Sequence, residues 1–484
     1  MGEVSLSKVM EELASEAPDR PALTCDGQTL SRMELDLTSN RLARVYGELG
    51  VVEDDLVTLA LPNSIDFVVA CLAIWKCGAT PQPVSHALPD AELGKIIELA
   101  NPRIVVGVDE DRSFGRPFLP RGFEAPPEVS DAALPEKTAA CWKAPTSGGS
   151  TGRPKLILAT SPATLDTKTA FAQGQVRDGV SLVPGPMYHN GPFACAMRAM
   201  FIGNHVVLCS RFDPEATLSL IERERVDWTL LVPTMMSRIW RLPESTRNKY
   251  DLSSLRYCLH FGAPCPVWLK EAWIAWLGPD RIFELFGPSE AQGATRINGH
   301  EWLAHPGSVG RPIDGCEVKV FDSEGVESPP GVVGEIYMRS STGKVTYRYL
   351  GAEAETLPGG WETVGDLGWV DEDGYLFFAD RRTDMIVTGG SNVYPAEIEA
   401  ALESHPSVKD SAVIGLPDDD KGQRLHAIVQ LEPEVSDDEL REHLRNHLVH
   451  YKIPSTFEHV AHSVRDEGGK VRRSGLRAER LPSA

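Results

Sequence analysis

The sequence predicts an α/β protein with a large N-terminal domain, over residues 1–380, and a small α+β C-terminal domain, over residues 381–484. Three observations support this prediction. A chain of 484 residues is too long for one compact core. Helical and strand-like patterns alternate through roughly the first 100 residues, which indicates β–α units around largely parallel sheets. From Gly310 onward the pattern changes to short alternating runs separated by Gly and Pro.

The spacing of apolar residues gives the expected elements of the N-terminal domain. Apolar residues at helical spacing predict helices, and short apolar runs bounded by turn residues predict strands. The predicted helices span residues 4–14, 32–49 and 65–77. The predicted strands span residues 56–60, 104–108, 206–209, 228–232 and 257–261. Residues 113–135, rich in Pro, Gly and Glu, are expected to form an irregular surface segment.

The later part of the chain is expected to add antiparallel strands and then the small domain. Runs at residues 317–321 and 334–338 favour antiparallel strands or a distorted β-barrel. The pattern changes again after the β region, and we place the domain boundary near Arg381. Beyond it, Pro395 suits the first position of a helix. Further elements of the α+β unit are predicted at residues 412–415, 427–431, 437–448 and 457–460.

Composition excludes several kinds of partner. The net charge of −21 argues against a surface that binds nucleic acid or an anionic membrane, because such a surface has to be basic. The longest apolar run, residues 67–75, is too short to cross a bilayer, and the N-terminus lacks the features of a signal peptide. The nine cysteines are never spaced as C-x-x-C, which favours buried reduced thiols over disulfides or a zinc site. We therefore expect a cytoplasmic monomer or homodimer with no membrane anchor and no nucleic-acid partner.

A glycine-rich segment carries the first chemical signal. It reads, in order, Ser147, Gly148, Gly149, Ser150, Thr151, Gly152, Arg153, Pro154 and Lys155. Glycines let backbone N–H groups converge on an anion, hydroxyls add donors, and the lysine offsets phosphate charge. The segment is therefore suited to the triphosphate of a nucleotide.

Other interpretations of this segment are less favourable. The P-loop pattern fails because no Gly-Lys-Ser/Thr follows, and the dinucleotide pattern fails on spacing. Gly148, Ser150 and Gly152 match the nucleophile elbow of an α/β-hydrolase, but that elbow needs a helix directly after the serine. Here Pro154 precedes a strand-like run instead. A plain flexible linker remains a structural interpretation of the segment taken alone.

Residues 147–155 resemble the signature T-S-G-T-T-G-x-P-K of the adenylate-forming superfamily. That superfamily includes acyl-CoA synthetases, the adenylation domains of peptide synthetases, and firefly luciferase. Ser147 and Ser150 keep the hydroxyls of the usual threonines, whereas Gly148 stands where a serine is usual. The chain is most similar to the AMP-forming ligases of acyl or aryl acids.

Further segments resemble the family in the same order along the chain. Residues 187–191 resemble the segment whose histidine borders the acyl pocket and the carboxylate, and residues 262–264 resemble a loop along the adenine ring. Residues 286–290 resemble Y-G-x-T-E, with an unusual proline at the variable position. That likeness implies an aromatic ring on adenine, a hydroxyl near the α-phosphate, and Glu290 as the Mg²⁺ ligand.

The C-terminal third continues the resemblance. Asp366 ends a segment similar to the family's T-G-D and would accept both ribose hydroxyls. Arg381 resembles the arginine at the hinge, although Thr383 stands where Asp or Lys is usual. Residues 388–399 resemble the loop and helix that line the thioester-forming site. Lys470 resembles the lysine of G-K-x-x-R, which contacts the acyl carboxylate and the bridging oxygen during adenylation.

The resemblance implies a complete set of site residues. The residues implied for ATP are Ser147, Gly148, Gly149, Ser150, Thr151, Gly152, Lys155, Gly262, Ala263, Pro264, Phe286, Gly287, Ser289, Asp366 and Arg381. Those implied for the acid are His189, Asn190, Phe193, Gly262 and Gly287, and those for the thiol are Gly389 and Gly390. Lys470, Glu290 and His189 would be catalytic. Each residue taken singly also fits a structural role, but their joint order over residues 147–473 favours the family.

The implied reaction needs ATP, Mg²⁺ and a thiol. A carboxylate attacks the α-phosphorus of ATP, and Mg²⁺, Lys470 and the loop amides neutralise the charge as pyrophosphate leaves. Coenzyme A, or the phosphopantetheine of a carrier protein, then attacks the adenylate. The resemblance implies that the C-terminal domain rotates between these steps, near residues 381–384.

The acid itself is less constrained. Residues 187–193, 232–234, 261–263 and 285–287 are expected to form a mostly apolar pocket. No aspartate in residues 187–193 could pair with an ammonium, which disfavours amino-acid activation. The His-Asn pair resembles enzymes that activate aryl acids, so an aromatic or cyclic acid is favoured over a long chain. The alternatives are an enzyme that loads a carrier protein, one that activates nitrite to diazotise an aromatic amine, and a non-enzymatic binding protein.

Overall fold

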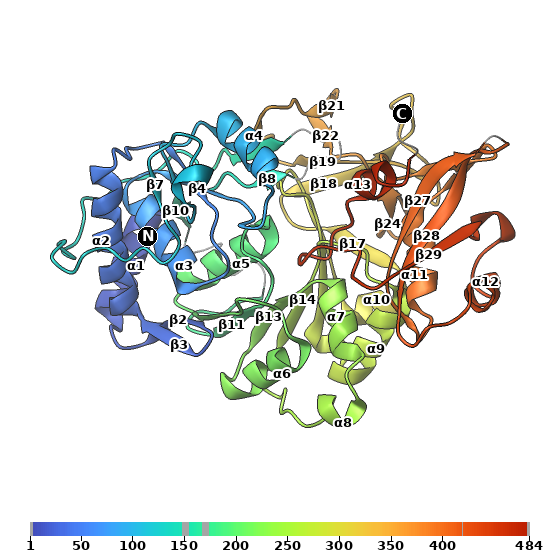
Figure 1. Cartoon of the computed structure of the whole chain (residues 1–484), viewed down its shortest axis with the longest axis horizontal. Coiled ribbons are helices and arrows are strands. Elements are labelled where there is room, and N and C mark those ends of the chain that lie inside the picture. The colour runs from blue at the N-terminus through green and yellow to red at the C-terminus, as the bar shows by residue number, and fades with distance from the viewer. Residues whose placement is uncertain (1–2, 148–153, 167–173, 419, 482–484) are drawn as a thin grey trace.

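The computed structural model describes residues 3–147, 154–166, 174–418 and 420–481. Within these residues it has an N-terminal region with two larger and two small sheets, and a small C-terminal lobe (Figure 1). The helices of the N-terminal region are α1 (Leu6–Glu16), α2 (Arg32–Glu48), α3 (Ile65–Lys76), α4 (Asp90–Ala100), α5 (Asn190–Phe201), α6 (Pro214–Arg223), α7 (Pro233–Trp240), α8 (Glu244–Arg247), α9 (Val267–Leu277) and α10 (Gly299–Ala304). Within the described ranges, no helix combines the length and apolar character needed to cross a membrane.

The first β–α units form a parallel sheet, as the sequence predicts. Its strand order is β5-β4-β6-β7, and every pair is parallel. The strands are β4 (Leu56–Leu59), β5 (Thr80–Pro83), β6 (Ile104–Val106) and β7 (Phe118–Leu119). The last of these is a short strand inside the segment that the sequence predicts to be irregular.

A second, larger sheet runs through the centre of the molecule. Its parallel strands follow the order β2-β12-β11-β13-β14-β15. The strands of this section are β2 (Pro21–Cys25), β11 (Val180–Val183), β12 (His205–Leu208), β13 (Trp228–Leu231), β14 (Tyr257–His260) and β15 (Ile282–Phe286), with β3 (Gln28–Ser31) antiparallel at the edge.

Both faces of this parallel section are covered by apolar layers. Val183 belongs to one core cluster and its neighbour Leu182 to another, and Leu230 and Leu231 divide in the same way. This alternation follows from the two-residue repeat of a strand, which sends successive side chains to opposite faces. The carboxyl ends of these strands are therefore held rigidly, and ligands of open α/β sheets bind at such ends.

The antiparallel strands predicted after Gly310 continue this sheet rather than forming a separate one. From β15 the order runs β16-β17-β24-β23-β19-β22-β21, with β18 attached to β19, and all of these pairs are antiparallel. The strands are β16 (Thr295–Asn298), β17 (Ser308–Pro312), β18 (Cys316–Phe321), β19 (Gly334–Ser340), β21 (Glu355–Leu357), β22 (Trp361–Thr363), β23 (Asp366–Val370) and β24 (Leu376–Arg381).

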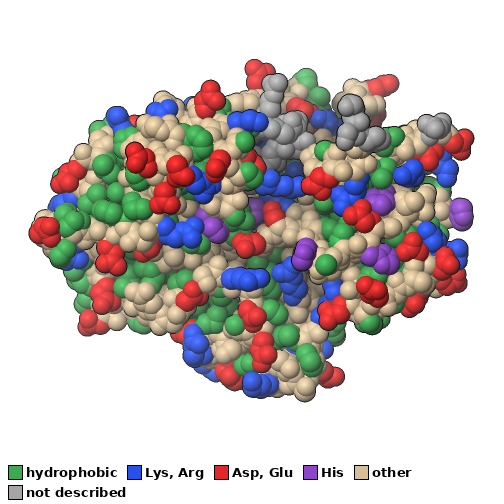
Figure 2. Space-filling model, viewed as in Figure 1, with side chains coloured by type: hydrophobic (Ala, Val, Ile, Leu, Met, Phe, Trp, Pro, Cys, Tyr) green, Lys and Arg blue, Asp and Glu red, His purple; other side chains and the backbone are tan. Residues whose placement is uncertain are grey.

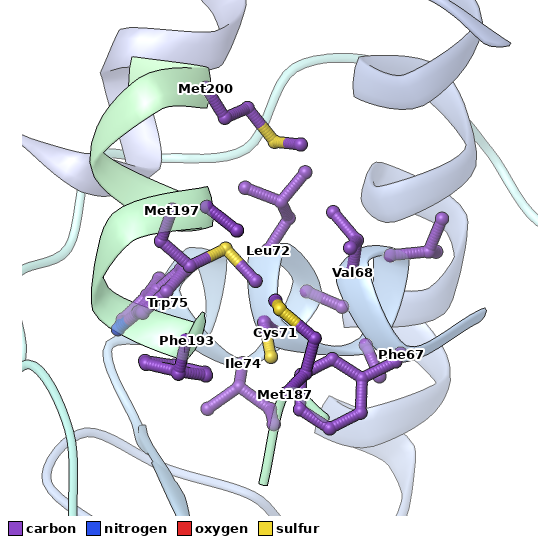
Figure 3. Close-up of a cluster of buried hydrophobic side chains, with 14 of the residues drawn as sticks. Phe67, Val68, Cys71, Leu72, Ile74, Trp75, Met187, Phe193, Met197 and Met200 are labelled. Carbon is purple, nitrogen blue, oxygen red and sulfur yellow. The ribbon is translucent and has the colours of Figure 1, made fainter. Parts of the chain in front are cut away.

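Small sheets complete the N-terminal region. A hairpin of β8 (Thr146–Ser147) and β9 (Lys155–Ala159) is extended by β20 (Tyr347–Leu350), and β1 (Val4–Ser5) pairs with β10 (Thr164–Leu165). The main core lies between α3 and α5, where Phe67, Trp75, Phe193 and Met197 converge (Figure 3). This packing fixes the start of α5, which carries two of the predicted site residues.

The C-terminal lobe is a small α+β unit, drawn in orange and red in Figure 1. Its sheet has the order β27-β28-β29, and a two-stranded hairpin of β25 and β26 precedes it. The elements are β25 (Ile386–Thr388), β26 (Ser391–Val393), α11 (Pro395–Glu403), β27 (Val408–Asp418), β28 (Gly422–Leu431), α12 (Asp437–Arg445), β29 (Thr456–Val460) and α13 (Arg473–Ala478). Ile398, Leu402, Val413 and Leu440 share its own apolar core. Pro395 begins α11, as the sequence predicts.

Differences from the predicted elements lie at their ends. The first helix begins at Leu6, because the hydroxyl of Ser5 accepts a hydrogen bond from the N–H of Ser7 and caps it. The strands β27 and β28, with 11 and 10 residues, are longer than predicted. Their outer parts pair with each other in a long hairpin, and tertiary pairing of this kind is not visible in local periodicity.

Candidate functional site

The loop that carries Lys470 lies against the N-terminal region. Gly468 adjoins His189 so closely that a Cβ atom on the glycine would be 2.2 Å from the imidazole Nε2. A Cβ atom on Gly469 would be 2.7 Å from the hydroxyl of Thr234. Two glycines side by side therefore permit this approach, and they place Lys470 beside the start of α5.

His189 is the residue that precedes α5, and its ring contacts that of Tyr188 at 4.5 Å between centroids. Its Nε2 lies 4.0 Å from Asp466 Oδ2, and no hydrogen-bond partner satisfies that nitrogen among the described residues. Burial, and then the nearby Lys470, lower the pKa of His189 to about 4. The imidazole is therefore neutral at physiological pH and can donate or accept one hydrogen bond on each nitrogen.

Lys470 sits within a tight turn built by Asp466. One carboxylate oxygen of Asp466 accepts hydrogen bonds from the backbone N–H groups of Gly468 and Lys470, both at 2.9 Å. Desolvation and then the charge of Arg381 lower the pKa of Lys470, while Asp466 and Glu290 act in the opposite direction. The charges of residues from three distant parts of the chain thus act on one lysine.

Glu290 is a buried carboxylate with a hydroxyl and an ammonium beside it. The hydroxyl of Tyr349 donates to its Oε1 at 2.5 Å, and Lys155 Nζ lies 3.5 Å from the same oxygen. Lys155 also lies 3.9 Å from the centre of the Tyr349 ring. Thr346 donates to the backbone carbonyl of Glu290 at 2.9 Å. The tertiary fold therefore joins the lysine of the glycine-rich segment to the predicted metal ligand.

Asp366 and Arg381 face each other across paired strands. They are register partners in β23 and β24, and Arg381 Nε lies 3.4 Å from Asp366 Oδ1. That oxygen is buried and has no hydrogen bond among the described residues. Burial raises the pKa of Asp366, and the charge of Arg381 opposes that shift. A buried acceptor left without a donor is suited to a ligand hydroxyl.

The predicted adenine-binding residues follow two adjacent parallel strands. Gly262, Ala263 and Pro264 come directly after β14, and Phe286 ends β15. Gly262 has a φ of +94°, a conformation that favours glycine, and Phe286 packs on Phe378 at 5.5 Å. The two segments therefore lie at one edge of the sheet. Gly287 and Ser289 extend the second segment, and a small pocket beside it is lined by Pro288, Gln292, Ile336, Met338, Glu362, Val364 and Asp366.

The predicted acid-binding residues divide between two surroundings. Asn190 begins α5, and its Oδ1 accepts a hydrogen bond from the ammonium of Lys143. Phe193 is 1% exposed and packs against Phe67, Trp75 and Trp142 in the main core. Phe193 therefore supports the wall around Asn190 from within the core, and its direct contact with the acid stays a prediction.

The predicted thiol-binding residues lie elsewhere. Gly389 and Gly390 form the turn between β25 and β26, are exposed, and have open space where a Cβ atom would stand. The N–H of Gly389 donates to the carbonyl of Lys421 at 3.0 Å, within the same lobe. The structure thus has the Lys470 loop, rather than this turn, against His189.

The centre of the glycine-rich segment falls outside the described residues. This applies to Gly148, Gly149, Ser150, Thr151 and Gly152. The residues on either side of it, Ser147 and Lys155, are antiparallel partners in β8 and β9. A strand, β9, and not a helix therefore follows the segment, which removes the structural context of a hydrolase elbow.

Several residues of the site were not predicted. Tyr349 and Thr346 contact Glu290, and Asp466 shapes the lysine turn. Thr234, by contrast, adjoins Gly469 and lies in the predicted pocket wall of residues 232–234. For Asp466 the sequence held a signal, because the run Asp466-Glu467-Gly468-Gly469 contains the Asp and Gly residues typical of a turn. Tyr349 had none, since its strand reaches Glu290 only through pairing with β9. Figure 2 shows Lys, Arg and His side chains gathered in the hollow between the lobes.

The comparison with known families agrees with this arrangement. The sequence model of the AMP-binding enzymes matches residues 10–350, and that of the AMP-binding enzyme C-terminal domain matches residues 397–470. The chain belongs to the AMP-binding enzyme family. The resemblance to adenylate-forming enzymes is therefore confirmed, and so is the α/β fold with a smaller C-terminal domain.

Relatives within the AMP-binding enzymes span nearly the whole chain. A fatty acid–[acyl-carrier-protein] ligase of Streptomyces coeruleorubidus is 31% identical over 96% of this chain and 94% of its own. A 2-succinylbenzoate–CoA ligase of Bacillus licheniformis is 29% identical over 96% and 98%. A feruloyl-CoA synthase of an Amycolatopsis species is 31% identical over 95% and 96%.

Solved structures give the same result. The o-succinylbenzoate CoA synthetase of Bacillus subtilis, in complex with its acyl-adenylate intermediate, superposes with a TM-score of 0.83 at 25% identity, covering 98% of both chains. An amide bond synthetase of Marinactinospora thermotolerans superposes with a TM-score of 0.81 at 25% identity, covering 99% of this chain and 100% of its own. The predicted enzyme class, an AMP-forming acid–thiol ligase, is confirmed.

Proposed function

We propose that this AMP-binding enzyme adenylates an aromatic or cyclic carboxylic acid with ATP and Mg²⁺, releases pyrophosphate, and transfers the acyl group to coenzyme A. The observation that supports this most is the position of the Lys470 loop. It lies on His189 and shares its surroundings with Glu290 and Arg381. These residues have the chemistry needed to hold a carboxylate against the α-phosphate of ATP.

In the first half-reaction, two anions must approach each other. Lys470 would place its ammonium on the oxygen that bridges the acid and the α-phosphate, where negative charge develops. His189, neutral because its pKa lies near 4, would donate a hydrogen bond to the acid without competing for the phosphate. Asp366 would accept the ribose hydroxyls through Oδ1, which has no hydrogen bond within the described residues. No proton transfer from the protein is needed, so positioning and electrostatics supply the rate enhancement.

The residues present fit a Mg²⁺ ion bound together with ATP. Mg²⁺ in nucleotide sites uses one or two carboxylates, phosphate oxygens and waters. Glu290 supplies a buried carboxylate, and Lys155 beside it could transfer from that carboxylate to a phosphate when ATP binds. The ion, when bound, would neutralise phosphate charge as pyrophosphate leaves.

The second half-reaction would need a different arrangement of the lobes. The Gly389–Gly390 turn is exposed, and we propose that rotation near residues 381–384 exchanges it for the Lys470 loop. Arg473 links this hinge to the lysine segment, since it lies 2.8 Å from Asp384 and 2.7 Å from Glu399. The hinge segment and the lysine segment would then move as one body. We place the boundary of the moving domain at residue 381.

The acid class is inferred from the apolar character of the predicted pocket wall. The ring of Phe261 adjoins Gly191, where a Cβ atom would be 2.2 Å away, so the helix start and the end of β14 are in close contact. Trp142 and Phe193 lie behind Asn190 at 6.1 Å from each other. Aromatic rings at this spacing favour a flat acid. The activity named for two of the relatives, on 2-succinylbenzoate and ferulate, supports the same class.

A carrier protein is the second candidate acceptor. One relative is named as a ligase that uses an acyl carrier protein, and it is as similar to this chain as those named for coenzyme A. Activation of nitrite to diazotise an aromatic amine remains an alternative of the same adenylating chemistry. We also propose a cytoplasmic location, which the nine free cysteines support.

The proposal is tested by two linked assays. Pyrophosphate release is first measured with ATP, Mg²⁺ and a panel of aryl, cyclic and straight-chain acids. The acids that react are then offered coenzyme A, a phosphopantetheinylated carrier protein, or an amine, and nitrite is tested with an aryl amine. We expect aryl acids to give the highest kcat/KM and coenzyme A to give a thioester. The proposal would be overturned if nitrite were the only substrate that supported pyrophosphate release, or if none of the acids supported it.

A further inference from the structure

Lys143 is a buried lysine that the proposed adenylation does not use. It lies four residues before the glycine-rich segment begins, and it is 7% exposed. Its ammonium donates to Oδ1 of Asn190, the first residue of α5. Lys470 reaches the neighbouring residue, His189, through Gly468. Consecutive residues at the start of α5 are thus in contact with two different lysine-bearing segments.

The charge of Lys143 is unmatched in a way that distinguishes it from the other buried lysines. Lys76 pairs with Asp36 at 2.5 Å, and Lys270 pairs with Glu284. Among the described residues, Lys143 has no carboxylate within ion-pair distance and only the amide oxygen of Asn190 as an acceptor. A buried ammonium without an anion is unfavourable by several kcal/mol, so such groups normally face a ligand or lose their proton.

The charge that acts most strongly on Lys143 is positive, and the carboxylate of Glu290 offsets only part of its effect. The first turn of α5 contains no acidic residue, and its free N–H groups present the positive end of the helix dipole. Arg198 lies on the same helix, two turns further on, and faces the ring of Trp142 at 5.9 Å. Lys143 Nζ lies 4.8 Å from the centre of that ring. Burial and Arg198 lower the pKa of Lys143 to about 7.

We infer that Lys143 is a specificity-determining residue that binds a second carboxylate on the acid, separate from the carboxylate that is adenylated. This inference rests on the proposed function, because it places the acid at His189 and Asn190. The reacting carboxylate meets the Lys470 side of this pair. The second carboxylate meets the Lys143 side and gives the buried ammonium the anion that the protein lacks. The preferred substrate is therefore an aromatic or cyclic dicarboxylic acid.

The test compares acids that differ only in the second carboxylate. Benzoate is compared with phthalate, isophthalate and terephthalate, and cyclohexanecarboxylate with its dicarboxylic forms, by pyrophosphate release at saturating ATP. We expect at least one dicarboxylate of a series to exceed its parent in kcat/KM by about 10-fold or more, since hydrogen bonds to charged groups contribute at that scale. Equal values within both series would overturn the inference, whereas no release with any acid would overturn the proposed function.

Variants assign the preference to this lysine. Lys143→Met should raise the KM of the preferred dicarboxylate about 10- to 100-fold with little change in kcat, and should change the parent acid less than about 3-fold. Lys143→Arg keeps the charge and should retain part of the preference. Lys95→Met, on the exposed face of α4, is the matched control and should behave as the unmodified enzyme. If Lys143→Met weakened the reaction of the parent acid and of the dicarboxylate to the same extent, Lys143 would have only a structural role.

A pH profile of the unmodified enzyme gives a readout that does not depend on any variant folding. Because the pKa of Lys143 is about 7, its charge is lost as the pH rises from 6 to 9. The KM of the dicarboxylate should rise through that range, and the KM of the parent acid should not. Identical pH dependence for the two acids would contradict the inference.

Discussion

The imidazole of His189 and the backbone of Gly468 are in direct contact, and a Cβ atom at residue 468 would lie 2.2 Å from Nε2. Real Cβ contacts are never this short, so the glycine is required for the lysine loop to reach the N-terminal region. This single approach connects the proposed acid site with the C-terminal lobe, and it makes their contact sensitive to one methyl group.

We predict that Gly468→Ala will reduce pyrophosphate release by about 100-fold, because a displacement of about 1 Å at the reacting atoms has effects of that size. In the His189→Ala background, Gly468→Ala should lower the rate far less than it does in the unmodified enzyme, because the ring that the methyl group would meet is absent. Additive losses in this cycle would show that the steric contact does not control adenylation. Gly475→Ala, at a position with open space, is the control.

Lys470→Ala should separate the two half-reactions. Adenylation should fall about 100- to 1000-fold, because the charge that develops on the bridging oxygen loses its closest cation. Thioester formation from a supplied acyl adenylate and coenzyme A should change little, since the proposed rotation would take the lysine loop out of the site in that step. Lys344→Ala, at an exposed position, should affect neither. Equal loss in both assays would contradict the role proposed for Lys470.

Glu290→Gln should raise the Mg²⁺ concentration needed for half-maximal pyrophosphate release about 10-fold or more, because an amide is a weaker ligand than a carboxylate. Tyr349→Phe removes the hydrogen bond to Glu290 but leaves the carboxylate, so it should shift the Mg²⁺ requirement much less. A Mg²⁺ titration at fixed ATP distinguishes the two. The same Mg²⁺ requirement in Glu290→Gln and the unmodified enzyme would exclude Glu290 as the ligand.

Asp366→Asn should raise the KM for ATP about 10- to 100-fold, since hydrogen bonds from the ribose to a charged acceptor would be weakened. The KM for the acid should stay the same. The comparison of ATP with 2′-deoxy-ATP gives the cause: the unmodified enzyme should prefer ATP strongly, and the variant should prefer it less. If the variant discriminated as well as the unmodified enzyme, the ribose contact would have to come from another residue.

His189 should make the folded protein less stable in acid. Its folded-state pKa is about 4, below the ordinary value of 6.5, so the unfolded chain binds a proton more readily. The contribution of the neutral His189 to the free energy of unfolding is complete above pH 6.5 and is lost as the pH falls toward 4. We expect the free energy of unfolding, measured with urea, to decrease between pH 7 and pH 5 in both proteins. The decrease in His189→Gln should be smaller than in the unmodified protein by roughly 1–2 kcal/mol. Equal losses would show that His189 titrates normally.

The sequence determined the family and the order of most elements, and it supplied predictions for the site residues. It did so because glycine-rich turns, apolar periodicity and short motifs depend on residues that are close together in the sequence. Such features can be recognised without the tertiary structure. The helices α2 and α3 and the strand β4 were predicted within one residue at each end for this reason. Asp366 and Arg381 were likewise predicted from the motif around each residue, without reference to the pairing of their strands.

Only the tertiary structure decided which residues meet. Tyr349 reaches Glu290 because β20 pairs with β9, and Phe193 lies in the core because α5 packs on α3. The loop of Lys470 contacts His189 across almost 300 residues of chain, a relationship that no local pattern encodes. For the same physical reason, the sequence could not show that Lys143 has no carboxylate within ion-pair distance among the described residues. Lys143 lies in a connecting segment before β8, and its environment depends on where the fold places α5 and the nearest carboxylates.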